Sequence, residues 1–367
     1  MRESLVAAGA RVMVGFQGHA ASEDVRRLIR DFRAASVILF ARNVDTPEQV
    51  AELVRELQGI ARDAGHELPL LVATDQEGGR VARLRRPWTE WPPPRALGRL
   101  ASEEHARRMG EAMAGELLAC GVGCDLAPVV DVDTNPRNPV IGDRSFADDP
   151  ELVGRLGAGM IRGLQEGGVA ACAKHFPGHG DTDLDSHLAL PAVDHGRSRL
   201  QEVELLPFRR AIEAGVACIM TAHILVRELD DRLPATLSPV LIEGVLRKEM
   251  GYGGVIVADD LEMKAVALRW RPAESALLAA LAGCDLLPVC HDHGAQVEAI
   301  ECLVRAVETE RLSWKVMEKA VARLRALKER FLLPYRDPDP RAARLAAGAG
   351  PRLALSEEIT ARSGIHA

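Results

Sequence analysis

The chain alternates short, continuously apolar runs with longer segments of helical periodicity. The apolar runs are rich in β-branched residues and do not alternate with polar positions, which is typical of strands that are buried on both faces. Parallel strands that are covered by helices need this pattern. The pattern predicts strands at residues 11–16, 36–41, 69–74, 122–132, 169–175, 216–223, 254–259 and 284–289.

Helical segments connect these strands. Thr46-Pro47 and Ser238-Pro239 each place a capping residue before a proline at the first helical position, which favours helix initiation there. Eight strands with intervening helices predict an α/β fold, an eightfold β/α (TIM) barrel that forms a single domain over residues 1–333. The predicted helices cover residues 46–64, 102–120, 149–166, 198–214, 238–250 and 272–282, and a helical end covers 294–332.

A doubly wound open sheet is the alternative fold. Its usual glycine fingerprint is missing, because Gly15-Phe16-Gln17-Gly18 is not a G-x-G-x-x-G turn. Beyond Pro334 the composition shifts to Arg, Asp, Pro, Ala and Gly. This shift predicts an extended tail over residues 334–367, not a separate domain.

Composition and charge narrow the class of protein. Hydrophobic residues make up 47% and charged residues 27% of the chain, which excludes a largely disordered protein. The net charge of −7 comes without a basic block, so we expect no nucleic-acid partner and no anionic membrane surface as a partner. No apolar run is long enough to span a membrane, and seven irregularly spaced cysteines do not suggest a disulfide framework. A cytoplasmic protein is therefore expected.

Acids, bases and cations collect just after five of the predicted strands. In a β/α barrel the loops that follow the strands converge at one end, where active sites lie. Charged groups destabilise a fold when they are buried without a partner, so this clustering predicts a polar, substrate-binding mouth. The residues concerned lie at 75–83, 131–146, 174–187, His223 and 259–260.

Three reaction classes can use such residues. Residues 175–187 contain three His and three Asp, but neither an H-x-H at a strand end nor an H-E-x-x-H helix supports a metal-dependent hydrolase. A phosphate site needs a glycine-rich turn that opens onto a helix, and Gly78-Gly79 is too short for one. Glycoside hydrolysis needs a carboxylate, a proton donor and hydrogen-bonding groups for sugar hydroxyls. Asp259, the loop with His187 and the charged strand ends fill these roles.

The segment KHFPGHGDTDLDSH at residues 174–187 is similar to the signature of glycoside hydrolase family 3. More narrowly, it resembles the branch of β-N-acetylglucosaminidases (β-hexosaminidases) that act in bacterial cell-wall recycling. Shorter matches occur in the family's order, and together they extend from Ser36 to about Val289. They are LFARN at 39–43, TDQEGGRVARL at 74–84, DRSF at 143–146 and VADDLEMKAV at 257–266.

The resemblance implies roles for individual residues. Asp259 resembles the nucleophile that forms a covalent glycosyl-enzyme intermediate, and His187, paired with Asp185, resembles the branch's acid/base. Chemistry alone would favour a second carboxylic acid as proton donor, although a histidine oriented by an aspartate titrates near working pH. The residues implied to hold the sugar hydroxyls are Asp75, Arg83, Arg144, Lys174 and His175, with Met263 lining the floor near Asp259.

The implied activity is that of a retaining exo-β-N-acetylglucosaminidase that acts on peptidoglycan-derived muropeptides and uses no metal or organic cofactor. A family 3 β-glucosidase and a catalytically silent sugar-binding barrel stay open as alternatives, as does a transglycosylase or phosphorylase preference. Ala258 stands before Asp259, where the family commonly has Ser or Thr. The sequence ends soon after the predicted barrel, so it resembles single-domain members, and we expect a monomer.

Overall fold

The computed structural model of the protein describes residues 2–183 and 190–366. Within this part of the chain, eight parallel strands form one sheet in the order β11-β9-β7-β6-β3-β2-β1-β12. A bridge between Val257 and Leu286 joins β11 to β12 and closes the barrel. The barrel strands are β1 (Val12–Val14), β2 (Ser36–Leu39), β3 (Leu71–Thr74), β6 (Cys124–Asp125), β7 (Ala170–Phe176), β9 (Cys218–Thr221), β11 (Val255–Val257) and β12 (Leu287–Val289).

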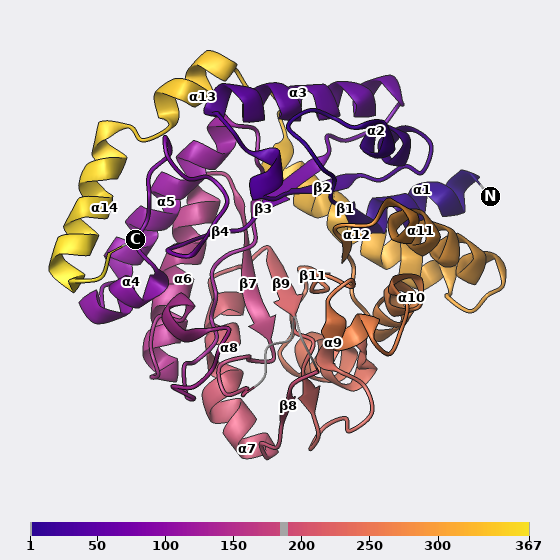
Figure 1. The fold of residues 1–367 in the computed structure, drawn as a ribbon. Helices are drawn as coiled ribbons and strands as arrows, with labels where there is room; N and C mark the ends of the chain where they lie inside the picture. The colour runs from indigo at the N-terminus through magenta and orange to yellow at the C-terminus, as the bar shows by residue number, and fades with distance from the viewer. Residues whose placement is uncertain (1, 184–189, 367) are drawn as a thin grey trace.

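Helices surround this barrel (Figure 1). The α-helices are α1 (Arg2–Arg11), α2 (Glu23–Arg30), α3 (Pro47–Asp63), α4 (Pro94–Leu100), α5 (Glu103–Ala119), α6 (Pro150–Glu166), α7 (Arg197–Arg199), α8 (Leu206–Glu213), α9 (Lys264–Ala267), α10 (Pro272–Ala282), α11 (His293–Glu308), α12 (Trp314–Leu332), α13 (Pro340–Ala346) and α14 (Gly350–Ser363). There are also shorter helical elements: the 3-10 turns η1 (Ala41–Asn43), η2 (Gly142–Arg144) and η4 (Ala235–Leu237) and the π-helical segments η3 (Leu200–Glu204) and η5 (Val240–Glu249). Among the described residues, two short strand pairs lie outside the barrel, β4 (Gln76–Gly78) with β5 (Val81–Ala82) and β8 (Ala192–Val193) with β10 (Leu225–Val226).

The predicted barrel is confirmed. Each of the eight predicted strand segments contains or overlaps a barrel strand. The predicted caps also form, since Thr46 Oγ1 accepts the N–H of Gln49 and Ser238 Oγ accepts the N–H of Leu241. Within residues 198–214 the helix is divided into α7, η3 and α8, and residues 294–332 form the two helices α11 and α12.

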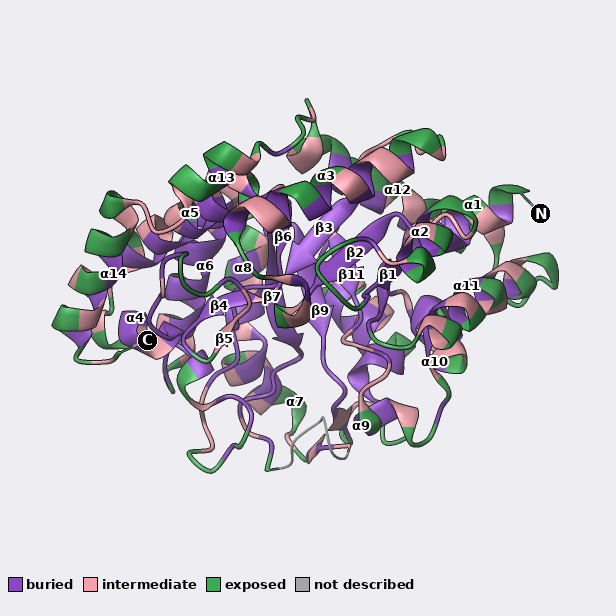
Figure 2. Cartoon of the chain, turned by 45° about the horizontal axis from the view of Figure 1, so that its top comes forward, coloured by how far each residue is buried: buried purple, intermediate pink, exposed green. Residues whose placement is uncertain are grey.

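Two apolar layers hold the barrel together. Figure 2 shows buried strands at the centre and helices whose outer faces are exposed. The strand side chains that point outward pack against the helices in one large cluster, and those that point inward form a second cluster. Leu324 and Leu327 of α12 belong to this inner cluster, so α12 covers the end of the barrel at which the strands begin.

The C-terminal residues are helical, and the prediction of an extended tail over 334–367 is wrong. Helix α13 packs against α3 and α5, and α14 packs against α4 and α5 (Figure 1, yellow). Asp339 caps α13 in front of Pro340, which is the same initiation signal as in the barrel helices. Ala343 and Ile359 are fully buried, because small and branched side chains on one helix face are enough to dock a short helix.

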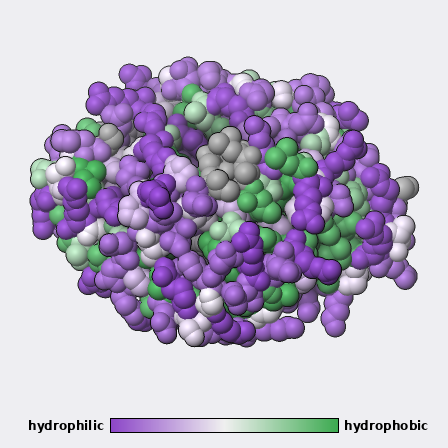
Figure 3. Space-filling model, turned by 60° about the horizontal axis from the view of Figure 1, so that its bottom comes forward, coloured by the Kyte–Doolittle hydropathy of each residue, from purple (hydrophilic) through white to green (hydrophobic). Residues whose placement is uncertain are grey.

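The outer surface is predominantly hydrophilic on the face that Figure 3 presents, with hydrophobic side chains gathered near its centre. Among the helices described here, none combines the length and the apolar character needed to cross a lipid bilayer.

Candidate active site

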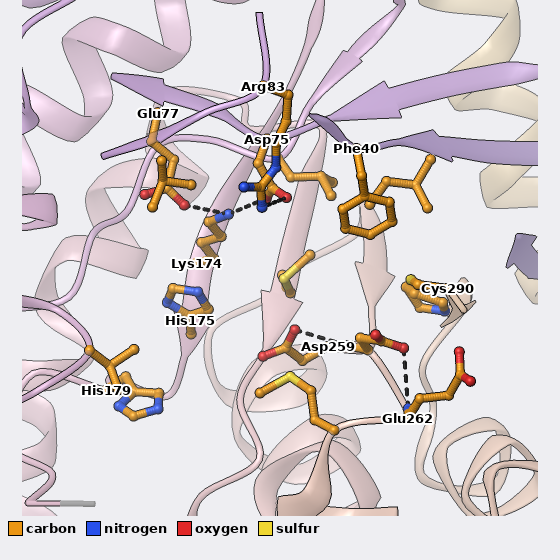
Figure 4. Close-up of a pocket in the computed structure, with 18 of the residues that line it drawn as sticks. Phe40, Asp75, Glu77, Arg83, Lys174, His175, His179, Asp259, Glu262 and Cys290 are labelled. Carbon is orange, nitrogen blue, oxygen red and sulfur yellow. Dashed lines mark hydrogen bonds and ion pairs between the residues drawn. The ribbon is translucent and has the colours of Figure 1, made fainter. Parts of the chain in front are cut away.

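A cavity of about 420 Å³ opens at the end of the barrel where the strands finish. Seven of the nine residues to which the family resemblance assigns a role line it, and Figure 4 shows several of them pointing toward one another. They come from the ends of different strands and from the loops that follow. The seven are Asp75, Arg83, Arg144, Lys174, His175, Asp259 and Met263.

One wall of the cavity is a chain of five alternating charges, here called the charge chain. Lys174 Nζ lies 2.8 Å from Asp75 Oδ1 and 2.7 Å from Glu77 Oε1. Arg83 Nη2 donates to Asp75 Oδ2 at 2.9 Å. At the other end Arg144 donates to both carboxylate oxygens of Glu77, each at 2.8 Å. Each charge is therefore next to at least one charge of opposite sign, in the order Arg83, Asp75, Lys174, Glu77, Arg144.

The charge chain remains ionised at neutral pH. Burial by itself would raise the pKa of Asp75, but Lys174 and Arg83 hold that pKa below its usual value. Burial would likewise raise the pKa of Glu77, but Arg144 and Lys174 outweigh it and hold that pKa below its usual value. Conversely, the carboxylates overcome burial and raise the pKa of Lys174. The wall thus offers fixed charged donors and acceptors to a polar ligand.

His175 is oriented by a buried aspartate below the cavity wall. The peptide bond between Lys174 and His175 is cis, and both side chains line the cavity. Asp131 Oδ2 accepts from His175 Nδ1 at 2.7 Å, and Asp131 Oδ1 accepts the N–H groups of His175 and His179. Burial would raise the pKa of Asp131, but His175 and these donors lower it. With Nδ1 held in this way, His175 Nε2 is turned to Arg144, 3.4 Å away.

Asp259 stands on the opposite side of the cavity from the charge chain (Figure 4). It lies two residues after the end of β11 and is partly exposed. Its Oδ1 accepts the N–H of Asp260 at 2.9 Å, which leaves carboxylate oxygen available to a ligand in the cavity. Met263 lies a few residues further along the same segment and also lines the cavity. This position suits a nucleophile that attacks a sugar held by the charge chain.

The acid/base that the resemblance implies, His187, and its partner Asp185 lie outside the described residues. His179 is a described histidine that lines the cavity. Burial and the neighbouring His175 lower the pKa of His179 to about 4, and its Nδ1 lies 2.7 Å from Thr182 Oγ1. His179 is therefore neutral at neutral pH and is not poised to donate a proton there.

Several residues of the site were missed at the sequence level. Glu77 lies two positions after Asp75 in the segment TDQEGGR, and this acid within a matched motif was a usable signal. Phe40, Glu262 and His291 also line the cavity. Phe40 and Glu262 lie within the matched segments LFARN and VADDLEMKAV but were given no role, and His291 lies in no matched segment. Among residues 2–183 and 190–366, no three His, Cys, Asp or Glu side chains are grouped so as to hold a metal ion.

Comparison with known proteins identifies the family. A profile of the glycosyl hydrolase family 3 N terminal domain matches residues 6–327. The beta-hexosaminidase of Alkalilimnicola ehrlichii is 41% identical over 295 residues, which cover 79% of this chain and 82% of that protein. Beta-hexosaminidase A of Pseudoalteromonas piscicida is 36% identical over 330 residues, and this match covers 84% of the chain but 55% of that relative.

The fold agrees with these sequence matches. The solved structure of a glycoside hydrolase family 3 beta-N-acetylglucosaminidase from Paenibacillus sp. str. FPU-7 has a TM-score of 0.91 and 43% sequence identity to this chain. The superposition covers 98% of this chain and 68% of that one. With a barrel of the same shape and a polar cavity at the expected end of its strands, the chain belongs to glycosyl hydrolase family 3.

Proposed function

We propose that the protein is a retaining exo-β-N-acetylglucosaminidase. The observation that carries this proposal is the presence of the Asp259 carboxylate in one cavity with the charge chain. Hydrolysis with retention needs a carboxylate beside the anomeric carbon and firm hydrogen bonds to the sugar hydroxyls. The names of the relatives, which are beta-hexosaminidases and a beta-N-acetylglucosaminidase, support the same sugar specificity.

In this proposal the charge chain and His175 bind the sugar. Asp75 and Glu77 are ionised acceptors for hydroxyl protons, whereas Arg83, Lys174 and Arg144 are donors to hydroxyl oxygens. Because the side chains of the charge chain are already ordered by their mutual ion pairs, they lose little conformational entropy when the sugar binds. A sugar fixed on this wall would present its anomeric carbon to Asp259 across the cavity.

The reaction then proceeds in two balanced steps. Asp259 forms a bond to the anomeric carbon while the bond to the leaving oxygen breaks, and His187 gives its proton to that oxygen. In the second step His187 takes a proton from water, the water oxygen bonds to the anomeric carbon, and the Asp259 carboxylate is released. The roles of His187 and of Asp185, which would orient it, rest on the sequence resemblance.

For the natural substrate we propose muropeptides that carry a non-reducing N-acetylglucosamine. This choice follows from the resemblance to the cell-wall recycling branch. The protein would then work in the cytoplasm as a monomer on a small carbohydrate, without a metal or organic cofactor. Muropeptide substrate, compartment and oligomeric state all remain predictions of the sequence.

Hydrolysis of an aryl N-acetyl-β-glucosaminide tests the proposal. Wild type should release nitrophenol, and Asp259→Asn should reduce kcat by several orders of magnitude, because the amide cannot form the covalent intermediate. The aryl β-glucoside, measured in parallel, decides between this function and the β-glucosidase alternative. Full activity of Asp259→Asn would contradict the role of Asp259. Saturable binding of N-acetylglucosamine without turnover would favour the silent sugar-binding barrel.

A further inference from the structure

The barrel closes at a short seam beside Asp259. Strand β11 meets the segment of β12 through one bridge, from Val257 to Leu286, the residue before β12. On their other sides, β11 pairs with β9 and β12 pairs with β1 over three residues each. The segment 258–263, which carries Asp259, begins directly after this seam. Two further backbone hydrogen bonds follow the bridge, from Ala258 N to Leu286 O and from Leu261 N to Pro288 O.

Side chains extend this seam beyond the ends of the strands. Glu262 Oε2 accepts the N–H of His291 at 2.6 Å, and its Oε1 accepts the N–H of Asp292 at 2.9 Å. One carboxylate of the segment after β11 thus occupies two consecutive backbone donors of the loop after β12. Hydrogen bonds between a carboxylate and backbone N–H groups are stronger than those between neutral groups.

Asp260 adds a second link between the same two loops. Its Oδ2 lies 3.2 Å from His291 Nε2, and its Oδ1 accepts the N–H of Glu262 at 3.2 Å. Its own N–H donates to Asp259 Oδ1. A continuous path of hydrogen bonds therefore runs from the Asp259 carboxylate through Asp260 to His291 and Glu262, and Figure 4 shows its first part.

We propose that Glu262 and the Asp260–His291 pair form a clamp that holds segment 258–263 on the loop after β12, and that Glu262 is a positioning residue for Asp259. This inference rests on the proposed function, because it assumes that Asp259 attacks the sugar. A displacement of about 1 Å at a reacting group costs as much as 100-fold in rate. The clamp therefore acts on the chemical step and not on the binding of the sugar, which the opposite wall carries.

The clamp has a defined response to pH. The groups that face Glu262 are the Asp260 carboxylate, the His291 ring, the Cys290 thiol and Arg42 of η1. Burial raises the pKa of Glu262, and the backbone donors only partly oppose this. When Glu262 is protonated, it loses its negative charge and its hydroxyl oxygen becomes a weaker acceptor for an N–H, so the clamp loosens in acid.

The test compares Glu262→Gln with Glu298→Gln, which makes the same chemical change at an exposed position of α11. With the aryl N-acetyl-β-glucosaminide, Glu262→Gln should lower kcat by about 10- to 100-fold with KM within about twofold of wild type. Its kcat should also fall less on acidification than that of wild type, because its clamp is already weakened. Glu262→Asp should recover part of kcat, and Glu298→Gln should match wild type.

Hydrogen exchange gives a second readout that needs no substrate. Backbone amides of residues 258–263 and 291–292 should exchange faster in Glu262→Gln than in wild type and Glu298→Gln. Unchanged exchange, an unchanged kcat, or a rise in KM at constant kcat would each overturn the clamp. If wild type releases no nitrophenol, the proposed function fails, while the exchange comparison still decides whether the clamp exists.

Discussion

The ammonium of Lys174 lies 2.7 Å from Oε1 of Glu77, and the two side chains are 3% and 0% exposed. Such a pair is stable only while its charges remain balanced, since an isolated buried charge is very costly. Here Asp75 and Arg144 complete the balance. The same groups are the proposed sugar ligands, so folding stability and substrate recognition depend on one set of contacts.

Glu77→Gln should lower the free energy of unfolding by about 3–5 kcal/mol, because it leaves Lys174 and Arg144 without their shared carboxylate. Urea unfolding at neutral pH measures this, with the exposed Glu298→Gln as the matched control. The pKa of Glu77 is held below its ordinary value of 4.5. Its contribution is therefore complete above pH 4.5 and is lost only as the pH falls through the lower, folded-state pKa. Equal midpoints for the two variants would contradict the prediction.

His179 should make the protein less stable in acid. Its folded-state pKa of about 4 lies below the ordinary 6.5, so the unfolded chain binds a proton first as the pH falls. The free energy of unfolding then decreases by about 3 kcal/mol between pH 6.5 and 4 from this group. His179→Gln should lose correspondingly less over that range, although its stability at pH 7 is reduced by the lost Thr182 contact. Parallel pH curves for wild type and variant would refute the assignment.

Lys328→Met should stabilise the protein at pH 7, by up to about 5 kcal/mol. Burial lowers the pKa of Lys328 to about 7. At pH 7 the native state therefore either gives up the proton of this amine or buries its charge away from water, and both cost stability. The carbonyl of Ala35, which accepts from Lys328 Nζ, also accepts the N–H of Leu71 and so keeps a partner.

The sign of the pH effect follows from the lowered pKa of Lys328. Between pH 7 and 10.5 the unfolded state binds more protons, and wild-type stability gains from this group as the pH rises. Lys328→Met should lack that gain, whereas Lys315→Met, at an exposed position of the same helix, should retain it. A destabilised Lys328→Met would show that the amine makes a net favourable contribution.

Asp125→Asn should be as stable as wild type or more stable at neutral pH, with unchanged nitrophenol release. Burial raises the pKa of Asp125 well above its ordinary value, and its Oδ2 is buried without a partner among the described residues. Because the carboxyl pKa is raised in the folded state, the free energy of unfolding decreases as the pH rises above about 4. Asparagine does not titrate, so the variant does not show this decrease. Asn can still accept the N–H of Gln76 through Oδ1. Thermal unfolding measures the effect, and Asp75→Asn, which breaks the charge chain, should be destabilised in the same assay.

The barrel, and the end of it at which the site lies, could be predicted from the amino-acid sequence. Continuous apolar runs such as residues 216–223 predict buried parallel strands, because every side chain in them must leave water whatever the partner is. The polar residues after each strand meet in one place because parallel strands all finish at the same end. Asp75, Lys174 and Asp259 could therefore be assigned to one mouth from their positions alone.

Which of these groups contact one another depends on the three-dimensional packing of the chain. Glu77 accepts from Lys174 and Arg144, which are 97 and 67 positions away, and Glu262 binds the amides of a loop about 30 positions further on. No local periodicity encodes such pairs, since a hydrogen bond or an ion pair forms only when the two atoms are placed to within a few tenths of an ångström. The helices α13 and α14 were missed for a related reason: their short apolar faces become recognisable only when the surface of α3, α4 and α5 is there to cover them.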